Sequence, residues 1–277
     1  MKILQSRAIR IAVSAVLVFG LTLGGSVALS EEDLASQATN PTAPLMQLRL
    51  QEQYQASWRD AGSYGNAALF QGIFPTALGW GSGAQAVINR VTMPYVTTPM
   101  IGGAGHATGM GDTAINTFFI TSWAKKGAII AWGPSITVPT AGDNSSTGAG
   151  SWQAGPTFVY LNTRTEGLQW GLMLFQQWSF DKIRVGAQDV SVLNIQPIFT
   201  KHFKNGWYIA TPDSPNTYDF ENDRWTLNLG GVLGRVTTWG KRPVQIFGGV
   251  YFNPVSYSGV PSPRVTFKLN ISFLYPQ

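Results

Sequence analysis

Residues 263–275, with the sequence PRVTFKLNISFLY, decide the fold class of this chain. One parity of the segment is apolar and consists of Val265, Phe267, Leu269, Ile271, Phe273 and Tyr275. The other parity is polar and consists of Arg264, Thr266, Lys268, Asn270 and Ser272. A strand directs successive side chains to opposite faces, so the segment predicts a strand with one apolar and one polar face. Its length fits the about 9–11 residues that cross a bilayer at a tilt, which predicts the last strand of an outer-membrane β-barrel.

The N-terminus predicts export from the cytoplasm. Three basic residues precede an apolar run over residues 11–23, and small residues lie just before the bond that follows Ser30. This order is typical of a cleaved signal peptide, and the run is shorter than the about 20 residues of a membrane-spanning helix. We therefore expect a signal peptide over residues 1–30, followed by a periplasmic lead-in or a short plug over residues 31–44.

The composition fits a membrane barrel and argues against a nucleic-acid partner. The chain has 19 Lys and Arg against 14 Asp and Glu, but three of the bases lie in residues 1–30 and the remainder is nearly neutral. Charged residues make up 12% of the chain, about half the share that is usual in soluble domains. The absence of Cys excludes disulfides and thiolate metal sites. After residue 30 no apolar run approaches the about 18 residues of a membrane helix, so only strands could cross.

Residues 45–277 divide into twelve predicted strands with alternately short and long connections. The predicted strands are residues 45–58, 67–74, 85–96, 113–122, 128–138, 151–162, 168–179, 190–203, 207–212, 223–236, 244–254 and 263–275. The long polar connections are residues 59–66, 97–112, 139–150, 180–189, 213–222 and 255–262. Short turns, such as the one at Asn205-Gly206, face the periplasm in barrels of this kind. We expect an all-β, antiparallel, up-and-down transmembrane barrel in the outer membrane of a Gram-negative type of envelope, with both termini in the periplasm.

Tryptophan supports the same topology. The predicted outer strand ends carry Trp58, Trp152, Trp178 and Trp225. The predicted inner ends carry Trp80, Trp123, Trp170, Trp207 and Trp239, and Trp132 lies deeper. Indole rings prefer the membrane–water interface, so two girdles are expected of a membrane barrel and not of a soluble β-sandwich.

The less apolar parity of each strand predicts what faces the barrel interior. The candidate lumen residues are Arg49, Arg90, Phe175, Gln177, Gln196, Tyr251, Lys268 and Asn270, together with Gln47, Gln51, Gln169, Met173, Asn194, Asn228, Gln245 and Phe247. This set contains three bases and no carboxylate, whereas a cation-selective pore is expected to carry Asp or Glu rings. The interior is therefore predicted to suit small neutral, aromatic or mildly anionic solutes, with Arg49 near Lys268. The alternative is an interior that is simply packed with side chains.

The loops offer few candidates for chemistry. A glycine-rich stretch, GGAGHATGMGD, lies in a predicted outer loop and is either flexible or folded inward as a gate. Its candidate gate residues are Gly103, His106, Gly109 and Asp112. The only other histidine, His202, lies beside a predicted periplasmic turn. Neither histidine has an evident serine partner, so no catalytic residue is assigned and both are expected to be solvated.

No cofactor or metal ion is expected. The predicted outer loops hold the acidic residues Asp60, Asp112, Asp143, Asp181, Asp189, Asp213, Asp219, Glu221 and Asp223. Their spacing matches no calcium-binding loop, and ordinary solvated charges are the simpler interpretation.

Several short blocks resemble a known family. They include GMGD at residues 109–112, VPTAGD at 138–143, WQAGPT at 152–157, GKRPV at 240–244 and the terminal FLYPQ. In order and spacing they resemble the outer-membrane proteins of the phenol-degradation (meta-pathway) transporter family, whose members often carry a misleading "neuromedin U" label. The resemblance spans most of the chain from Asp33 onward. It implies a barrel and the uptake of small hydrophobic or aromatic compounds, and it supplies no catalytic motif.

These patterns favour a porin-like, non-enzymatic channel for passive passage of small solutes. The expected partners are outer-membrane lipid, the solute and the barrel-assembly machinery during insertion. The alternatives are a lipid- or lipopolysaccharide-modifying enzyme, a structural or surface-interaction barrel with a closed lumen, and a soluble secreted β-sandwich.

Overall fold

The computed structural model describes residues 30–78, 84–100, 105–121, 127–142 and 146–276, so the predicted signal peptide lies almost wholly outside the described residues. In the described part of the chain, the helix α2 (Glu31–Thr39) precedes the sheet. The strands are β1 (Leu45–Arg59), β2 (Gly65–Ala77), β3 (Ala84–Pro99), β4 (His106–Met110), β5 (Thr113–Thr121), β6 (Ala128–Val138), β7 (Ser151–Thr165), β8 (Leu168–Lys182), β9 (Ser191–His202), β10 (Trp207–Ala210), β11 (Asn216–Asp219), β12 (Arg224–Thr226), β13 (Leu229–Trp239), β14 (Arg242–Phe252) and β15 (Ser262–Pro276).

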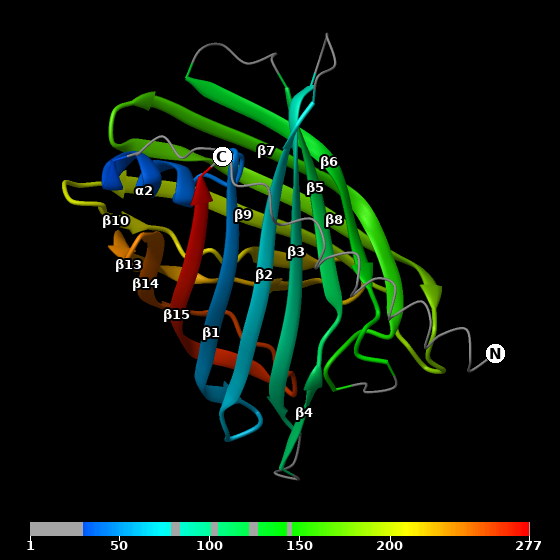
Figure 1. Ribbon diagram of the computed structural model, residues 1–277. Helices are drawn as coiled ribbons and strands as arrows, with labels where there is room; N and C mark the ends of the chain where they lie inside the picture. The colour runs from blue at the N-terminus through cyan, green and yellow to red at the C-terminus, as the bar shows by residue number, and fades with distance from the viewer. Residues whose placement is uncertain (1–29, 79–83, 101–104, 122–126, 143–145, 277) are drawn as a thin grey trace.

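The strands close into one antiparallel barrel (Figure 1). The last strand pairs with the first, from Leu45 opposite Pro276 to Arg59 opposite Ser262. Three wall strands are each built from two segments. Strands β4 and β5 both pair with β3, and β10 and β11 both pair with β9. Strands β12 and β13 form the next wall strand, because β12 pairs with β11 and β13 pairs with β10. The strand segments therefore form twelve wall strands, which confirms the predicted fold class.

The predicted turn at Asn205-Gly206 is present. Both residues adopt positive φ, 58° for Asn205 and 71° for Gly206. This conformation suits a two-residue hairpin turn and is most accessible to Asn and Gly. The turn joins β9 to β10, with Tyr208 opposite His202.

The predictions for two outer loops are wrong in part. Residues 97–112 were expected as a loop, but β3 and β4 continue as a hairpin with Pro99 opposite His106. Residues 213–222 contain β11, which pairs with β12. In both cases glycine and proline content favoured a loop in the sequence, whereas cross-strand pairing decided the conformation.

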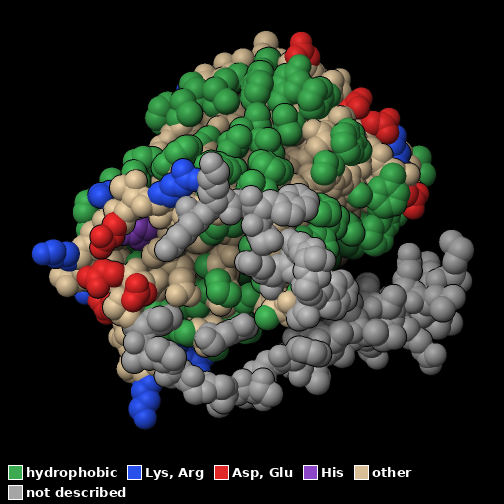
Figure 2. All heavy atoms as spheres, turned by 90° about the horizontal axis from the view of Figure 1, so that it is seen from above, with side chains coloured by type: hydrophobic (Ala, Val, Ile, Leu, Met, Phe, Trp, Pro, Cys, Tyr) green, Lys and Arg blue, Asp and Glu red, His purple; other side chains and the backbone are tan. Residues whose placement is uncertain are grey.

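The barrel wall has its polar side inside. In β15, Lys268 and Asn270 are buried, whereas Phe267 and Leu269 between and beside them are 51% and 54% exposed. Figure 2, which looks down from the top of Figure 1, shows hydrophobic side chains over the wall and most of the visible charged ones toward its two ends. This inverted arrangement is that of a transmembrane barrel, whose lipid-facing band is apolar.

Six tryptophans of the described residues are exposed; one is Trp132 of β6, and the other five lie toward the two ends of this outer surface. Trp170, Trp207 and Trp239 lie near the barrel end that carries α2, and Trp178 and Trp225 lie toward the opposite end. All five are 41–50% exposed. Of the other predicted girdle members, Trp80 and Trp123 lie outside the described residues.

Helix α2 lies inside one mouth of the barrel. Its N-terminus is capped by Ser30, whose hydroxyl accepts a hydrogen bond from the Asp33 amide at 3.0 Å. Leu34, Ala35 and Ala38 pack against wall residues from β10, β13, β14 and β15. Residues 31–44 were predicted to be a free lead-in or a short plug; because α2 packs against the wall, we refer to it as the helical plug. Among the described residues, no helix is long and apolar enough to span a bilayer.

The lipid-facing band predicts a strong penalty for charge on its surface. Leu269 lies midway along β15 and is 54% exposed. We expect Leu269→Arg to lower the free energy of unfolding by about 2–4 kcal/mol, the cost of a base at the bilayer midplane. Denaturant unfolding in lipid vesicles measures it. Leu269→Ala is the control for the lost side chain, and equal losses for the two variants would contradict a lipid-facing position.

Candidate functional site

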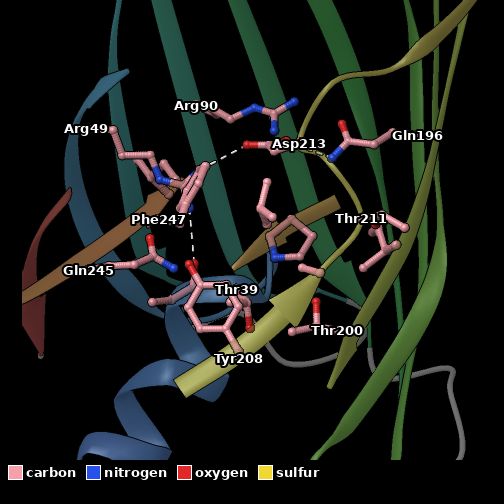
Figure 3. A pocket seen from close by; sticks show the side chains of 16 residues that line it. Thr39, Arg49, Arg90, Gln196, Thr200, Tyr208, Thr211, Asp213, Gln245 and Phe247 are labelled. Carbon is pink, nitrogen blue, oxygen red and sulfur yellow. Dashed lines mark hydrogen bonds and ion pairs between the residues drawn. The ribbon is translucent and has the colours of Figure 1, made fainter. Parts of the chain in front are cut away.

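An interruption of the ninth wall strand builds the candidate site. Residues 211–215, TPDSP, separate β10 from β11, and both strands pair with β9. Pro212 and Pro215 have no N–H to donate to a sheet ladder, so the strand cannot continue regularly through them. We call residues 211–215 the inward segment, because Figure 3 shows its Asp213 inside the barrel, beside Arg49, Arg90 and Gln196.

The Asp213 carboxylate is fully engaged by side chains of the wall. One oxygen, Oδ2, lies 3.1 Å from an Arg49 guanidinium nitrogen. The other, Oδ1, accepts a 2.7 Å hydrogen bond from the Gln196 amide. These contacts come from β1 and β9, which are not neighbours in the wall, so they cross the interior.

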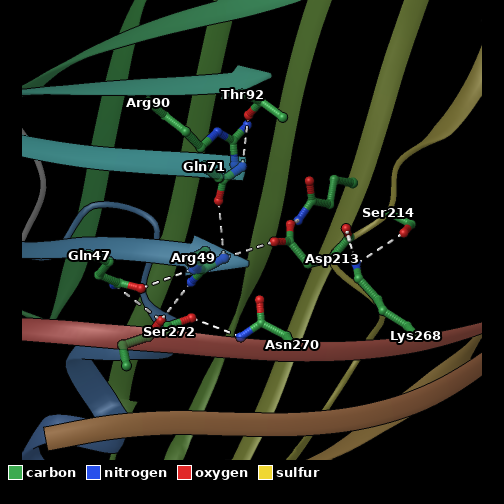
Figure 4. Close-up of polar contacts among 12 residues, drawn as sticks. Gln47, Arg49, Gln71, Arg90, Thr92, Asp213, Ser214, Lys268, Asn270 and Ser272 are labelled. Atoms are coloured by element: carbon green, nitrogen blue, oxygen red, sulfur yellow. Dashed lines mark hydrogen bonds and ion pairs between the residues drawn. The ribbon is translucent and has the colours of Figure 1, made fainter. Parts of the chain in front are cut away.

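Lys268 holds the same segment from a third strand. Its Nζ donates to the backbone oxygen of Asp213 at 2.6 Å and to the Ser214 hydroxyl at 3.3 Å (Figure 4). Arg49 and Lys268, which were expected to lie near each other, thus both contact Asp213. The prediction that Asp213 lies in an outer loop and that the lumen has no carboxylate is wrong.

The sequence did contain a signal for this feature. A proline pair spaced by two polar residues interrupts what would otherwise be a continuous wall strand. Judged from its local sequence alone, such a segment predicts a turn, because Pro, Asp and Ser favour turns. Its inward course follows from tertiary contacts to Arg49 and Lys268, which lie far away in the sequence.

Arg49 connects the inward segment to the helical plug. Besides Asp213, its guanidinium donates to the Ala38 backbone oxygen of α2 at 3.1 Å and to the Gln47 side-chain oxygen at 3.1 Å. A further bond reaches the Gln71 oxygen at 3.3 Å (Figure 4). One buried arginine therefore anchors both pieces of chain that occupy the interior.

Arg90 lies nearby with a different set of contacts. Its recorded partners in the described part of the chain are the Met173 sulfur at 3.8 Å and the Phe118 ring, 5.6 Å from guanidinium carbon to ring centre. No carboxylate of the described residues forms an ion pair with it. The interior thus places three bases, Arg49, Arg90 and Lys268, around one acid.

A cavity lies between α2 and the inward segment. Its volume is about 80 Å³, within about 720 Å³ of space between atoms that includes open solvent. Its polar lining includes Arg49, Arg90, Gln196, Asp213 and Gln245, and its apolar lining includes Ile73, Ile198, Val232 and Phe247 (Figure 3). We call this cavity the chamber.

The remaining predicted lumen residues lie in the wall but outside the chamber. Tyr251 donates its hydroxyl to the Gln53 side chain at 2.9 Å, and Asn270 donates to Ser272 at 2.8 Å. Gln177 hydrogen-bonds to the Thr137 hydroxyl. Phe175 packs at the edge of an apolar cluster that includes Met173 and Phe118. The structure therefore brings together only part of the predicted set: Arg49, Arg90, Gln196, Gln245 and Phe247 at the chamber, with Lys268 at the inward segment.

The predicted loop gate is not found as an inward fold in the described residues. Gly103 lies outside them, and His106 and Gly109 belong to β4, where His106 is exposed. Asp112 accepts hydrogen bonds from the backbone amides of residues 141 and 149, at 3.2 and 2.7 Å, and so organises the neighbouring loop.

Both histidines have partners that the sequence did not indicate. His106 Nε2 lies 3.0 Å from the Ser63 hydroxyl, and its ring lies 4.5 Å from that of Tyr64. His202 Nε2 lies 2.9 Å from the Thr39 hydroxyl at the end of α2. The expectation that His106 lacks a serine partner is wrong, since strand pairing brings Ser63 and the start of β4 together although they are 43 residues apart. Among the described residues, no three His, Cys, Asp or Glu side chains are grouped so as to hold a metal ion.

Comparison with known proteins identifies the fold. No protein-family model and no curated protein sequence matches the chain. An outer membrane channel from Pseudomonas putida F1 is similar in structure, with a TM-score of 0.60 and 14% identity over 83% of this chain and 93% of that one. The NanC porin (TM-score 0.49, 12% identity, 84% and 100% covered) and the outer membrane phospholipase A from Escherichia coli (0.43, 11%, 83% and 96%) are more distant. By its fold the chain is a transmembrane β-barrel of the kind found in bacterial outer membranes, and the resemblance to the phenol-degradation family stays a prediction.

The Arg49–Asp213 pair predicts a measurable coupling. We expect Arg49→Met to lower the free energy of unfolding by about 3 kcal/mol, the low end of the range for a broken buried pair, because it leaves a partly buried carboxylate without its cation. Adding Asp213→Asn should recover much of this loss, and a double-mutant cycle in vesicles measures the coupling. The control is Arg235→Met, which breaks a half-exposed 3.7 Å pair with Glu31 and should cost about 1 kcal/mol or less. Additive losses for Arg49 and Asp213 would contradict the pair.

Proposed function

We propose that the chain is an outer-membrane channel through which small hydrophobic, aromatic or mildly anionic solutes pass down their gradient. The observation that carries this proposal is the chamber, a cavity inside a closed barrel with basic, amide and apolar walls. A lumen that binds a solute through several weak contacts can both admit and release the solute. The fold shared with an outer membrane channel adds support.

The orientation is part of the proposal. The start of β1 and the end of β15 lie at the same barrel end, where Leu45 pairs with Pro276 and α2 enters (Figure 1). The tight turn at Asn205-Gly206 lies at this end too, since Asn205 bonds to Glu32 of α2. Short turns are typical of the periplasmic side, so we place both termini there, after cleavage of a signal peptide. Lipid surrounds the apolar band, and the barrel-assembly machinery inserts the chain.

Purified protein in planar bilayers and proteoliposomes tests the channel. We expect a small conductance and faster entry of neutral and anionic aromatic solutes than in empty vesicles. No conductance together with unchanged permeation would contradict the channel and favour a structural barrel with a closed lumen.

The plug predicts a variant with a larger pore. Leu34 is 5% exposed and packs in the apolar contact between α2 and the wall. Because a buried carboxylate without a partner is costly, Leu34→Asp should release α2 while all wall strands stay paired. We expect a higher single-channel conductance, with Leu34→Met as the volume-conserving control. Equal conductance of the two variants would contradict a plug.

A second candidate, an enzyme acting on lipid, is favoured by one observation. The Ser63 hydroxyl and His106 Nε2 lie 3.0 Å apart at an exposed barrel rim, a distance at which a histidine can activate a serine. No acidic partner of His106 is recorded in the described part of the chain. Incubation with labelled phospholipid and lipopolysaccharide decides between the candidates: hydrolysis that is lost in Ser63→Ala and His106→Ala would favour the enzyme over a purely passive channel.

A further inference from the structure

The chamber carries more positive than negative charge. Arg49 of β1 and Arg90 of β3 line it, and Lys268 of β15 lies next to it at the inward segment, whereas the single carboxylate of the lining, Asp213, comes from that segment. Lys268 donates to the backbone oxygen of Asp213 and to Ser214, not to the carboxylate. Only Arg49 is directly paired, so two positive charges at this level have no ion-pair partner among the described residues.

Arg90 is the base that is open to a further ligand. A guanidinium offers five N–H donors, and a carboxylate is the partner that can accept two of them side by side. In the described part of the chain its recorded contacts are a thioether sulfur at 3.8 Å and the face of Phe118. Both are weak partners for a partly buried cation. Figure 3 shows the guanidinium at the chamber, turned toward Asp213.

The protein's own carboxylate shows that the chamber accommodates this chemical group. Asp213 reaches into it with one oxygen on Arg49 and the other on Gln196. The residue is carried by a short segment between Pro212 and Pro215, not by a wall strand. A free carboxylate that enters the chamber can bind Arg90, which has no ion-pair partner among the described residues, whereas Arg49 is already paired with Asp213. Asp213 therefore competes with such a ligand for the cations of the chamber.

We propose that the chamber is a binding site for a small carboxylate with a compact apolar body, held mainly by Arg90 in competition with Asp213. The apolar wall of Ile73, Ile198, Val232 and Phe247 would contact the body of such an anion. This inference rests on the proposed channel function and specifies the solute class that the channel selects. The competitor keeps the binding weak enough for the anion to leave, which conduction requires.

Equilibrium dialysis of radiolabelled benzoate against the intact, detergent-solubilised barrel tests the site without requiring transport. We expect Arg90→Gln to weaken binding about tenfold, as removal of one charge-assisted contact does, and Arg90→Lys to weaken it less. Asp213→Asn should strengthen binding several-fold, because it removes the competing charge. Benzamide, which has the same ring without the charge, should bind weakly to the wild type and respond to none of these changes.

The matched control is Arg264→Gln, which removes the same charge from an exposed residue near the start of β15. Heat-modifiable gel mobility confirms that each variant is folded. Three outcomes would each overturn the site. The wild type does not bind benzoate, Arg90→Gln and Arg264→Gln weaken binding equally, or Asp213→Asn binds benzoate more weakly than the wild type. Benzoate binding without conductance would contradict the channel alone, and conductance without benzoate binding would contradict the site alone.

Discussion

The structure depends on one constraint: inside a bilayer every backbone N–H and C=O group must find a partner within the protein. The pairing of β15 with β1 meets it, because it removes the two edges that an open sheet would leave. Closure then sorts the side chains, since one face of each strand meets lipid and the other meets the interior. The buried Lys268 and the exposed Leu269 are neighbours in sequence because of this sorting.

The inward segment is possible for the same reason. Pro212 and Pro215 interrupt a ladder at membrane depth, where irregular backbone is tolerated only if it is buried in protein or lines a cavity. The chain supplies the missing partners itself: Lys268 donates to the Asp213 oxygen, and Asn228 donates to the Pro215 oxygen at 2.6 Å. Arg49 then joins this segment to α2 through Asp213 and Ala38. The plug and the interruption are thus one connected structure in the lumen.

The sequence predicted the barrel well because alternation, turn residues and strand length are local properties. The closing strand and the turn at Asn205-Gly206 are examples. The site was predicted only in part: parity identified Arg49, Arg90 and Lys268, but the Asp213 between two prolines read as a loop residue. Its position depends on contacts 164 and 55 residues away along the chain. The contact between Ser63 and His106 was missed for the same reason, since no local pattern brings together residues that are 43 positions apart.

The charge pattern in the chamber is better explained by function than by stability. A largely buried ion pair such as Arg49–Asp213 costs desolvation energy that offsets much of its attraction, and apolar side chains of similar size often stabilise a protein as well or better. Arg90 strengthens this comparison, because it adds a second, partly buried guanidinium to the chamber lining without adding a carboxylate. Selection for stability alone would remove such a charge or neutralise it. The lumen retains the Arg90 charge near Asp213, which lies on the inward segment and not on a wall strand. This arrangement is expected where an anion enters, binds the cations in exchange for Asp213 and leaves.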